Sequence, residues 1–425
     1  MRNQVAPADA SRMPDSILAR FHHTRSLSRD LARGLNEADM TVQSMPDASP
    51  VKWHLAHTTW FFETFLLRDH VPGYRLFDER WPFLFNSYYE AEGARIARPD
   101  RGLLTRPSVA EMLAYRDHVD EAMTAALPRL AERHGDLIEL GIQHEQQHQE
   151  LLLTDLKHLF SCNPLGPAYA AAGGASGAMP SPPLRWIEGA EGLAQIGSAG
   201  DGFAFDNELP RHPSWLAPHA LASRPVTNGE WAEFIADRAY DTPSLWLADG
   251  WDRIRADGIV APLYWRRRDG EWDHFTLAGW QPIDLDAPAP HISFYEADAF
   301  ATWAGARLPT EQEWEAAAAG ADPLGGVQLD AAGAIAPVAE EDDGAFASLF
   351  GNVWEWTGSA YRPWPGYRPA AGAVGEYNGK FMSGQFVLKG GSCATPRGHA
   401  RASYRNFFHP HQRWQFTGVR LARSL

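Results

Sequence analysis

The spacing of apolar residues along the chain changes once, near residue 164. Before that point, apolar side chains recur three and four positions apart in four stretches, at 14–38, 50–69, 108–130 and 136–160. This spacing places the apolar side chains of a helix on one face, where they pack against other helices. The first part of the chain is therefore predicted to be a four-helix bundle.

The stretch 164–183 is rich in Pro, Gly, Ala and Ser, which is typical of a linker. After it, short aromatic segments alternate with Gly, Pro, Asp and Asn. A helical pattern returns only at 227–237, 294–305 and 310–318, and Thr310 and Glu313 have the spacing of a capping box.

These patterns predict a multidomain protein of α and α+β type. We expect a helical bundle over residues 1–163, a linker over 164–183, and an irregular α+β domain with little regular structure over 184–425.

Composition narrows the class of partner. The formal net charge of −15 disfavours nucleic acid and anionic membranes, because both attract clustered Lys and Arg. The chain has no run of about 18 apolar residues and no signal-peptide pattern at its start. The two cysteines, Cys162 and Cys393, do not form a disulfide framework or a C-x-x-C motif. We expect a cytoplasmic protein that acts on small molecules.

The sequence "HEQQHQE" at 144–150 carries the candidate chemistry. His144 and His148 lie four residues apart, so a helix places both imidazoles on one face. Leucines one and two turns away mark the same face as buried. Because unpaired imidazoles are costly inside a bundle, this pair predicts a metal site.

The first five letters of this motif also fit the zinc-protease pattern H-E-x-x-H. A protease needs a third ligand downstream, but residue 154 is Thr and 164–183 contains no acidic residue. Asp155 lies on the same helix and does not match the usual protease geometry. The sequence therefore disfavours a protease.

A third ligand is expected from "WHLAHTTWFFETFLL" at 53–67, where periodicity leaves both His54 and His57 open. Three imidazoles leave an octahedral ion three free positions, which suits a redox-active iron(II) that must gather a substrate and dioxygen. A closed structural zinc site requires a fourth protein ligand.

Several long motifs resemble the ergothioneine-biosynthesis sulfoxide synthases, the EgtB family. They are "PVKWHLAHTTWFFETFLL", "FLFNSYYEAEGARI", "HEQQHQELLLTDLKH", "RLPTEQEWEAAA", "GNVWEWT", "GEYNGKFM" and "LKGGSCATPRGHARASYRNFFHPHQRWQFTGVRLA". The resemblance covers nearly the whole chain in order. It implies a DinB-like four-helix bundle followed by a C-type-lectin-like domain of the formylglycine-generating-enzyme kind.

The resemblance also implies a cofactor and a reaction. Fe(II) would be held by His57, His144 and His148, with His54 in a supporting or packing role. With dioxygen as co-substrate, the family joins the sulfur of a thiol to C2 of the imidazole of hercynine and oxidises that sulfur to a sulfoxide. The protein's contribution would be chiefly proximity and orientation.

Further site residues follow from the same motifs. Gln147 would contact the substrate imidazole, and Asn406 and Phe407 would lie near the trimethylammonium group, which aromatic faces and C–H contacts can bind. Tyr88 and Tyr89 are the candidate proton donors, and at least one of the two is expected only to pack in an aromatic core.

One departure from the family concerns the thiol. The branch that uses γ-glutamylcysteine carries an Asp and an Arg where this chain has Phe408 and Gln412. Losing this charged pair weakens binding of the dipeptide's ionic groups, which favours cysteine as the thiol. Arg413 keeps γ-glutamylcysteine open as the alternative.

Four further functions stand as alternatives. An ovothiol-type 5-histidylcysteine sulfoxide synthase and a selenoneine synthase are the nearest alternatives. A formylglycine-generating enzyme needs a cysteine pair, whereas the second half of the chain has only Cys393. A metal-binding, lectin-like protein without catalysis is the remote alternative.

Overall fold

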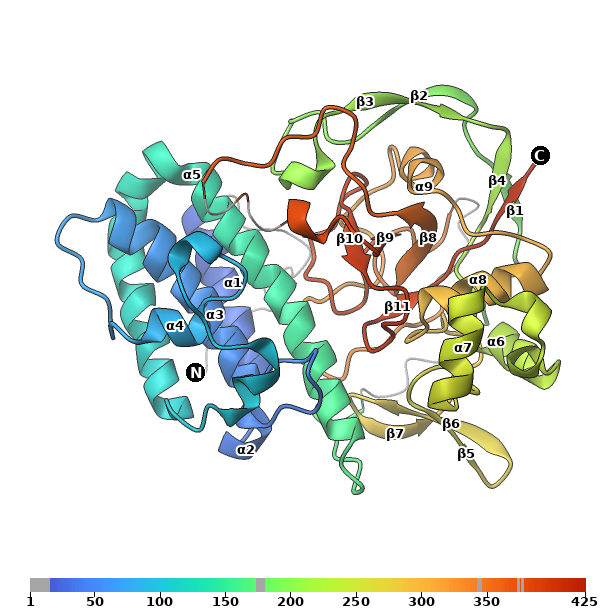
Figure 1. Cartoon of the computed structure of the whole chain (residues 1–425), viewed down its shortest axis with the longest axis horizontal. Coiled ribbons are helices and arrows are strands. Elements are labelled where there is room, and N and C mark those ends of the chain that lie inside the picture. Colours follow the sequence, from blue (N-terminus) through green and yellow to red (C-terminus); the bar gives the residue numbers. More distant parts are fainter. Residues whose placement is uncertain (1–15, 173–179, 342–345, 373–374, 376–377) are drawn as a thin grey trace, which may run out of the picture.

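The computed structural model describes residues 16–172, 180–341, 346–372, 375 and 378–425. Residues 173–179 of the predicted linker lie outside these ranges. Figure 1 shows a helical part and a strand-containing part side by side, with all the labelled strands in the second. Within the described ranges, no helix combines the length and apolarity needed to cross a bilayer.

The first part is helical, as predicted. Its long helices are α1 (Ile17–Ala32), α3 (Val51–Phe62) and α5 (Val109–Ser161). A π-helical segment (Glu63–Arg68) extends α3, and α2 (Glu37–Thr41), α4 (Trp81–Phe85) and two 3₁₀ turns (Glu90–Glu92, Arg98–Leu103) lie in the connections. Helix α5 packs against both α1 and α3.

Helix α5 accounts for two of the predicted helices. Its 53 residues include a kink at His134, where φ is −130° and ψ is 27°. Pro128 also lies inside the helix, and proline removes one backbone hydrogen bond there. The predicted break between 130 and 136 is thus a kink rather than a loop, and its two arms replace the third and fourth predicted helices.

The second part contains several small sheets. The strands are β1 (Trp186–Glu188), β2 (Gly192–Ile196), β3 (His212–Leu216), β4 (His219–Ala222), β5 (Trp265–Arg268), β6 (Glu271–Thr276), β7 (Gly279–Pro282), β8 (Trp354–Ala360), β9 (Phe386–Lys389), β10 (Asn406–Phe408), β11 (Thr417–Gly418) and β12 (Ala422–Ser424). They form the sheets β1-β4-β12, β2-β3, β5-β6-β7 and β10-β9-β8-β11, and only the β8–β11 pair is parallel.

Helices of the second part occur where the sequence predicts them, with one addition. They are α6 (Asn228–Ala236), α8 (Phe294–Trp303), α9 (Glu311–Ala317) and the unpredicted α7 (Ala248–Asp257). The capping box is confirmed, because the Thr310 side chain accepts from the Glu313 amide and the Glu313 carboxylate accepts from the Thr310 amide. The multidomain α and α+β architecture is therefore as expected.

The two parts are joined by polar contacts as well as by a shared apolar core. The half-buried carboxylate of Glu150 on α5 accepts hydrogen bonds from Trp354 Nε1 (2.8 Å), Ser392 Oγ (2.6 Å) and Thr395 Oγ1 (2.7 Å) of the second part. Three donors on one carboxylate fix the second part against α5, close in sequence to the histidine pair.

Candidate metal centre

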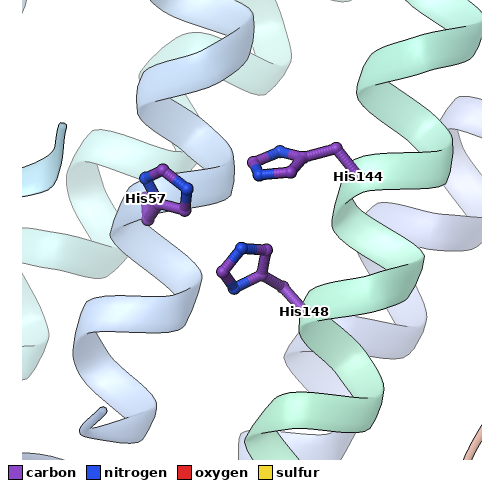
Figure 2. Close-up of side chains that lie close together, drawn as sticks. All are labelled: His57, His144 and His148. Atoms are coloured by element: carbon purple, nitrogen blue, oxygen red, sulfur yellow. The ribbon is translucent and has the colours of Figure 1, made fainter. Parts of the chain in front are cut away.

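Three histidines from two helices point toward one another (Figure 2). His57 lies on α3, and His144 and His148 lie one turn apart on the facing side of α5. One ring nitrogen from each lies within 4.8 Å of the other two. The i, i+4 spacing therefore brings the pair to a common point, and His57 completes the group.

Burial keeps these imidazoles neutral. It lowers the pKa of His144 to about 4 and holds the pKa of His57 and His148 well below the ordinary value, with neighbouring imidazoles adding to the effect. Each ring therefore has a free lone pair at neutral pH. The Nδ1 of His57 lies 2.5 Å from the carbonyl oxygen of Phe85, so Nδ1 carries the proton and Nε2 has the lone pair that can bind a metal.

Such a donor set fits a divalent transition metal. The buried Nδ1 of His144 has no hydrogen-bond partner among the residues that the structure describes, which is unusual for a buried polar atom. Three neutral imidazoles with no carboxylate in the group suit iron(II), which would keep open positions for substrate and oxygen.

The glutamate between the two α5 histidines turns away from them. Glu145 forms ion pairs with Arg116 and with Arg25 (2.8 Å) and accepts from Ser28 Oγ (2.6 Å). Burial alone would raise its pKa, but Arg116 and Arg25 lower it to about 2. A carboxylate held in this way cannot act as the general base of a metalloprotease, so its position excludes that function.

A stack of planar groups holds His57 from the other side. The Trp53 ring lies parallel to the His57 imidazole at a centroid distance of 4.5 Å. The Arg101 guanidinium lies 3.4 Å from the Trp53 ring centroid. This stack limits rotation of the imidazole and brings a positive charge close to the histidine group.

A cavity of about 380 Å³ opens on the three histidines and is lined by both parts of the protein. Seven residues predicted for the site from the sequence line it: Tyr88, Tyr89, Gln147, Asn406, Phe407, Phe408 and Gln412. The volume is typical of a site for small molecules.

Arg413 is not brought to this cavity. Its guanidinium forms an ion pair with Glu296 (3.1 Å) and donates to the carbonyl of Ala261 (2.5 Å). Its charge is therefore already neutralised elsewhere. The neighbouring Gln412 does line the cavity, and its side-chain oxygen accepts from the amide of His409.

The two candidate proton donors have different surroundings. Tyr89 is buried, and its ring contacts those of Trp60, Phe61 and Phe65. The half-buried Tyr88 lies at the boundary between the two parts, where its ring meets Phe381 edge-on at 4.9 Å. Tyr88 is thus shared between the parts, whereas Tyr89 packs within the bundle.

A hydrogen-bond chain that the sequence did not reveal orients Gln147. Its Nε2 donates to the hydroxyl of Tyr404 (2.7 Å), which lies 3.2 Å from Nε2 of His399. The Nδ1 of His399 faces the side-chain oxygen of Gln146 at 3.3 Å. One N–H of the Gln147 amide is thus engaged, and its oxygen has no hydrogen-bond partner among the described residues, so it can accept from a ligand. Tyr404 lies within the long motif near the C-terminal end of the sequence that begins "LKGGSCATPRG", but its role depends on contacts across the two parts.

The sequence motifs also gave no indication of two arginines that line the cavity. Arg98 and Arg101 line it, and neither forms an ion pair with a carboxylate of the described residues. Burial and the nearby Arg98 lower the pKa of Arg101 to about 9, so it stays charged at neutral pH. Two unpaired guanidinium groups make this side of the cavity suitable for a carboxylate.

Comparisons with known proteins agree with this architecture. Residues 20–152 match the DinB superfamily, and residues 186–340 and 327–425 match the sulfatase-modifying factor enzyme 1-like domain. The hercynine oxygenase of Mycolicibacterium smegmatis is 36% identical over 91% of this chain and 94% of its own length.

Two further relatives come from other organisms. The ergothioneine biosynthesis protein 1 of Schizosaccharomyces pombe is 28% identical over 52% of this chain and 28% of its own length. The hercynine oxygenase of Mycobacterium tuberculosis is 34% identical over 94% of this chain and 97% of its own length. With such similarity over almost the whole of both chains, the protein belongs to the hercynine oxygenase (EgtB) family, in which a DinB-like bundle precedes a formylglycine-generating-enzyme-like domain.

Proposed function

We propose that this protein is an iron(II)-dependent oxygenase that joins the sulfur of a thiol, cysteine in preference to γ-glutamylcysteine, to C2 of the hercynine imidazole. Hercynine, the thiol and dioxygen would yield the sulfoxide and water. One oxygen atom is retained on sulfur, and the other leaves as water with the C2 and thiol hydrogens. Formation of the C–S bond and oxidation of the sulfur together release the four electrons that dioxygen accepts, so no further reductant is needed.

The observation that carries this proposal is the convergence of three neutral imidazoles at a cavity lined by both parts of the protein. Bound iron(II) would supply the redox chemistry with dioxygen. Its protein ligands would be His57, His144 and His148. The names of the relatives support hercynine as the other substrate.

The residues of this chain would chiefly orient the substrates. The free amide oxygen of Gln147 can accept from an imidazole N–H, which leaves the other imidazole nitrogen for the metal. Phe407, stacked on Tyr361 at a centroid distance of 4.1 Å, offers an aromatic wall for a trimethylammonium group. Asn406 precedes it on β10 and lines the same cavity.

The charges of the cavity support an amino-acid thiol. Arg98 and Arg101 can bind one carboxylate, which both cysteine and γ-glutamylcysteine possess. A second ionic partner for the glutamyl group is absent at Phe408 and Gln412, which are uncharged. Because Arg413 is paired with Glu296, it does not replace the missing charge.

Steady-state kinetics with both thiols tests the choice of substrate. We expect kcat/KM to favour cysteine by at least about tenfold, which corresponds to roughly 1.4 kcal/mol of transition-state binding. Phe408→Asp combined with Gln412→Arg should narrow the difference, and Arg413→Gln should not change it if that variant folds normally. Equal or better turnover of γ-glutamylcysteine by the unmodified enzyme would contradict the preference.

An anaerobic titration separates the remaining alternatives. Iron(II)-nitrosyl spectra of the protein should respond to hercynine followed by cysteine. A response to unmethylated histidine in place of hercynine would favour the ovothiol-type reaction. A response to a selenosugar in place of cysteine would favour selenoneine synthesis. Absence of bound iron would favour a lectin-like binding protein.

A further inference from the structure

His54 lies beside the metal centre with both ring nitrogens engaged. Its Nδ1 is 2.8 Å from Nδ1 of His148, and its Nε2 is 3.0 Å from Oδ2 of Asp155. His54 and Asp155 are both buried. His54 therefore has no lone pair left for a metal, although its sequence position left it open as a ligand.

The direction of each hydrogen bond follows from the chemistry of the three groups. A carboxylate only accepts, so Nε2 of His54 carries the proton and donates the hydrogen bond to Asp155. A neutral imidazole has a single N–H, so the lone pair of the His54 ring lies on Nδ1. Its Nδ1 must then accept, and Nδ1 of His148 must donate. This leaves Nε2 of His148 as the nitrogen with a free lone pair.

Asp155 is itself held by both parts of the protein. Its Oδ2 also accepts from the backbone amide of Ser49 (2.8 Å), and its Oδ1 accepts from Nε1 of Trp414 (3.3 Å). Ser49 lies two residues before the start of α3, and Trp414 belongs to the second part. The carboxylate is thus fixed at the point where α3, α5 and the second part meet.

We propose that Asp155 and His54 are positioning residues, which hold His148 as an Nε2 donor and make its imidazole a stronger ligand. This inference rests on the proposed function for the identity of the metal. Carboxylate–histidine–metal chains orient a ligand and increase its basicity. In this protein a second imidazole, that of His54, stands between the carboxylate and the ligand His148. Trp414 of the second part donates to the Asp155 carboxylate and holds it in place.

The test measures the metal centre without turnover. In His54→Leu and in Asp155→Asn, anaerobic chelator competition should give iron(II) affinity about 10- to 100-fold weaker than in the unmodified protein. The iron(III)/iron(II) midpoint potential should rise in Asp155→Asn, because a less basic imidazole stabilises iron(III) less. The nitrosyl complex should also change its electron paramagnetic resonance spectrum.

A conservative variant separates positioning from general loosening of the bundle. The side-chain oxygen of His54→Asn can still accept from Nδ1 of His148 but does not reach Asp155. Its iron affinity should lie between those of the unmodified protein and His54→Leu. Equal losses in the Asn and Leu variants would show a purely structural role and overturn the proposal.

His158→Gln is the matched control. His158 lies on the same helix, and its Nδ1 bonds to Ser44 Oγ at 2.7 Å. Within the described part of the chain it forms no hydrogen bond with His54, Asp155 or His148. Iron affinity and potential should stay unchanged there. If the unmodified protein binds iron and His54→Leu and Asp155→Asn retain its affinity, potential and spectrum, this inference fails while the proposed function stands. If the unmodified protein binds no iron, both fail.

Discussion

At the scale of single residues, burial determines the protonation state of the histidines. The pKa of His144 is about 4 in the folded protein, against about 6.5 in an unfolded chain. The unfolded state therefore binds more protons as pH falls through 6.5, and the folded state loses stability until the pH approaches 4. Each such histidine costs about 1.4 kcal/mol per pH unit in this window.

Denaturant unfolding of the metal-free protein between pH 7.5 and 4.5 measures this effect. The free energy of unfolding should decrease on acidification below about pH 6.5. The free energy of unfolding of His144→Gln should decrease less steeply, by about 1.4 kcal/mol per pH unit, which is the contribution of one such histidine. Identical slopes in the two proteins would contradict a depressed pKa for His144.

The identity of the proton donor is a second prediction for single residues. If Tyr88 or Tyr89 supplies a proton, its replacement by Phe should lower sulfoxide formation by about 10² to 10⁴ while hercynine binding is retained. Oxidation of the thiol to a sulfinic acid should increase in its place. Product ratios measured by mass spectrometry check both variants.

Unchanged ratios in both single variants and in the double variant would reject these two residues. Tyr377 is the comparison to include, because it precedes the cavity residue Asn378 in the sequence, although Tyr377 itself lies outside the described residues. A loss confined to Tyr377→Phe would assign the proton donor to the second domain.

At the scale of elements, close packing of α3 against α5 sets the spacing of the histidines. A Cβ atom at Gly141, one turn before His144, would lie 2.6 Å from the ring of Phe62 and 3.1 Å from that of Phe61. Both rings are fully buried and have no room to move. Gly141 therefore permits the approach of the two helices.

Gly141→Ala should lower the free energy of unfolding by about 1 to 2 kcal/mol, because overpacking outweighs the gain in helix propensity. It should also weaken iron binding by separating His57 from the pair on α5. Gly135→Ala in the same helix is the control, since its Cβ would meet nothing within 4 Å. Thermal and denaturant unfolding of both variants tests this packing. Equal stability of Gly141→Ala and Gly135→Ala would contradict it.

Elements with strong local signals were predictable from the sequence. The 3.6-residue periodicity located the helices of the bundle, and the Thr310 capping box located the start of α9. The joining of two predicted helices into α5 was not predictable, because the chain passes from one arm to the other through a kink at His134, without a loop, where the apolar periodicity breaks. Helix α7 was missed between irregular aromatic segments.

At the scale of the whole molecule, the cavity depends on contacts between residues far apart in sequence. The periodicity identified His144 and His148 but could not choose between His54 and His57. In the structure, Asp155 and His148 occupy both nitrogens of His54, whereas His57 lies close to the pair, which supports our proposal of His57 as the third ligand. Likewise, the bonds of Gln147 to Tyr404 and of Arg413 to Glu296 join distant segments, so no local pattern indicates them.

We propose that one iron(II) at His57, His144 and His148 supports oxygen consumption that depends on hercynine. The most direct measurement is oxygen uptake, with product analysis, after reconstitution with one equivalent of iron(II). We expect uptake to require both hercynine and cysteine, to yield one sulfoxide per dioxygen, and to be lost together with iron binding in His57→Ala. Uptake independent of hercynine, or full iron content and activity in His57→Ala, would contradict it.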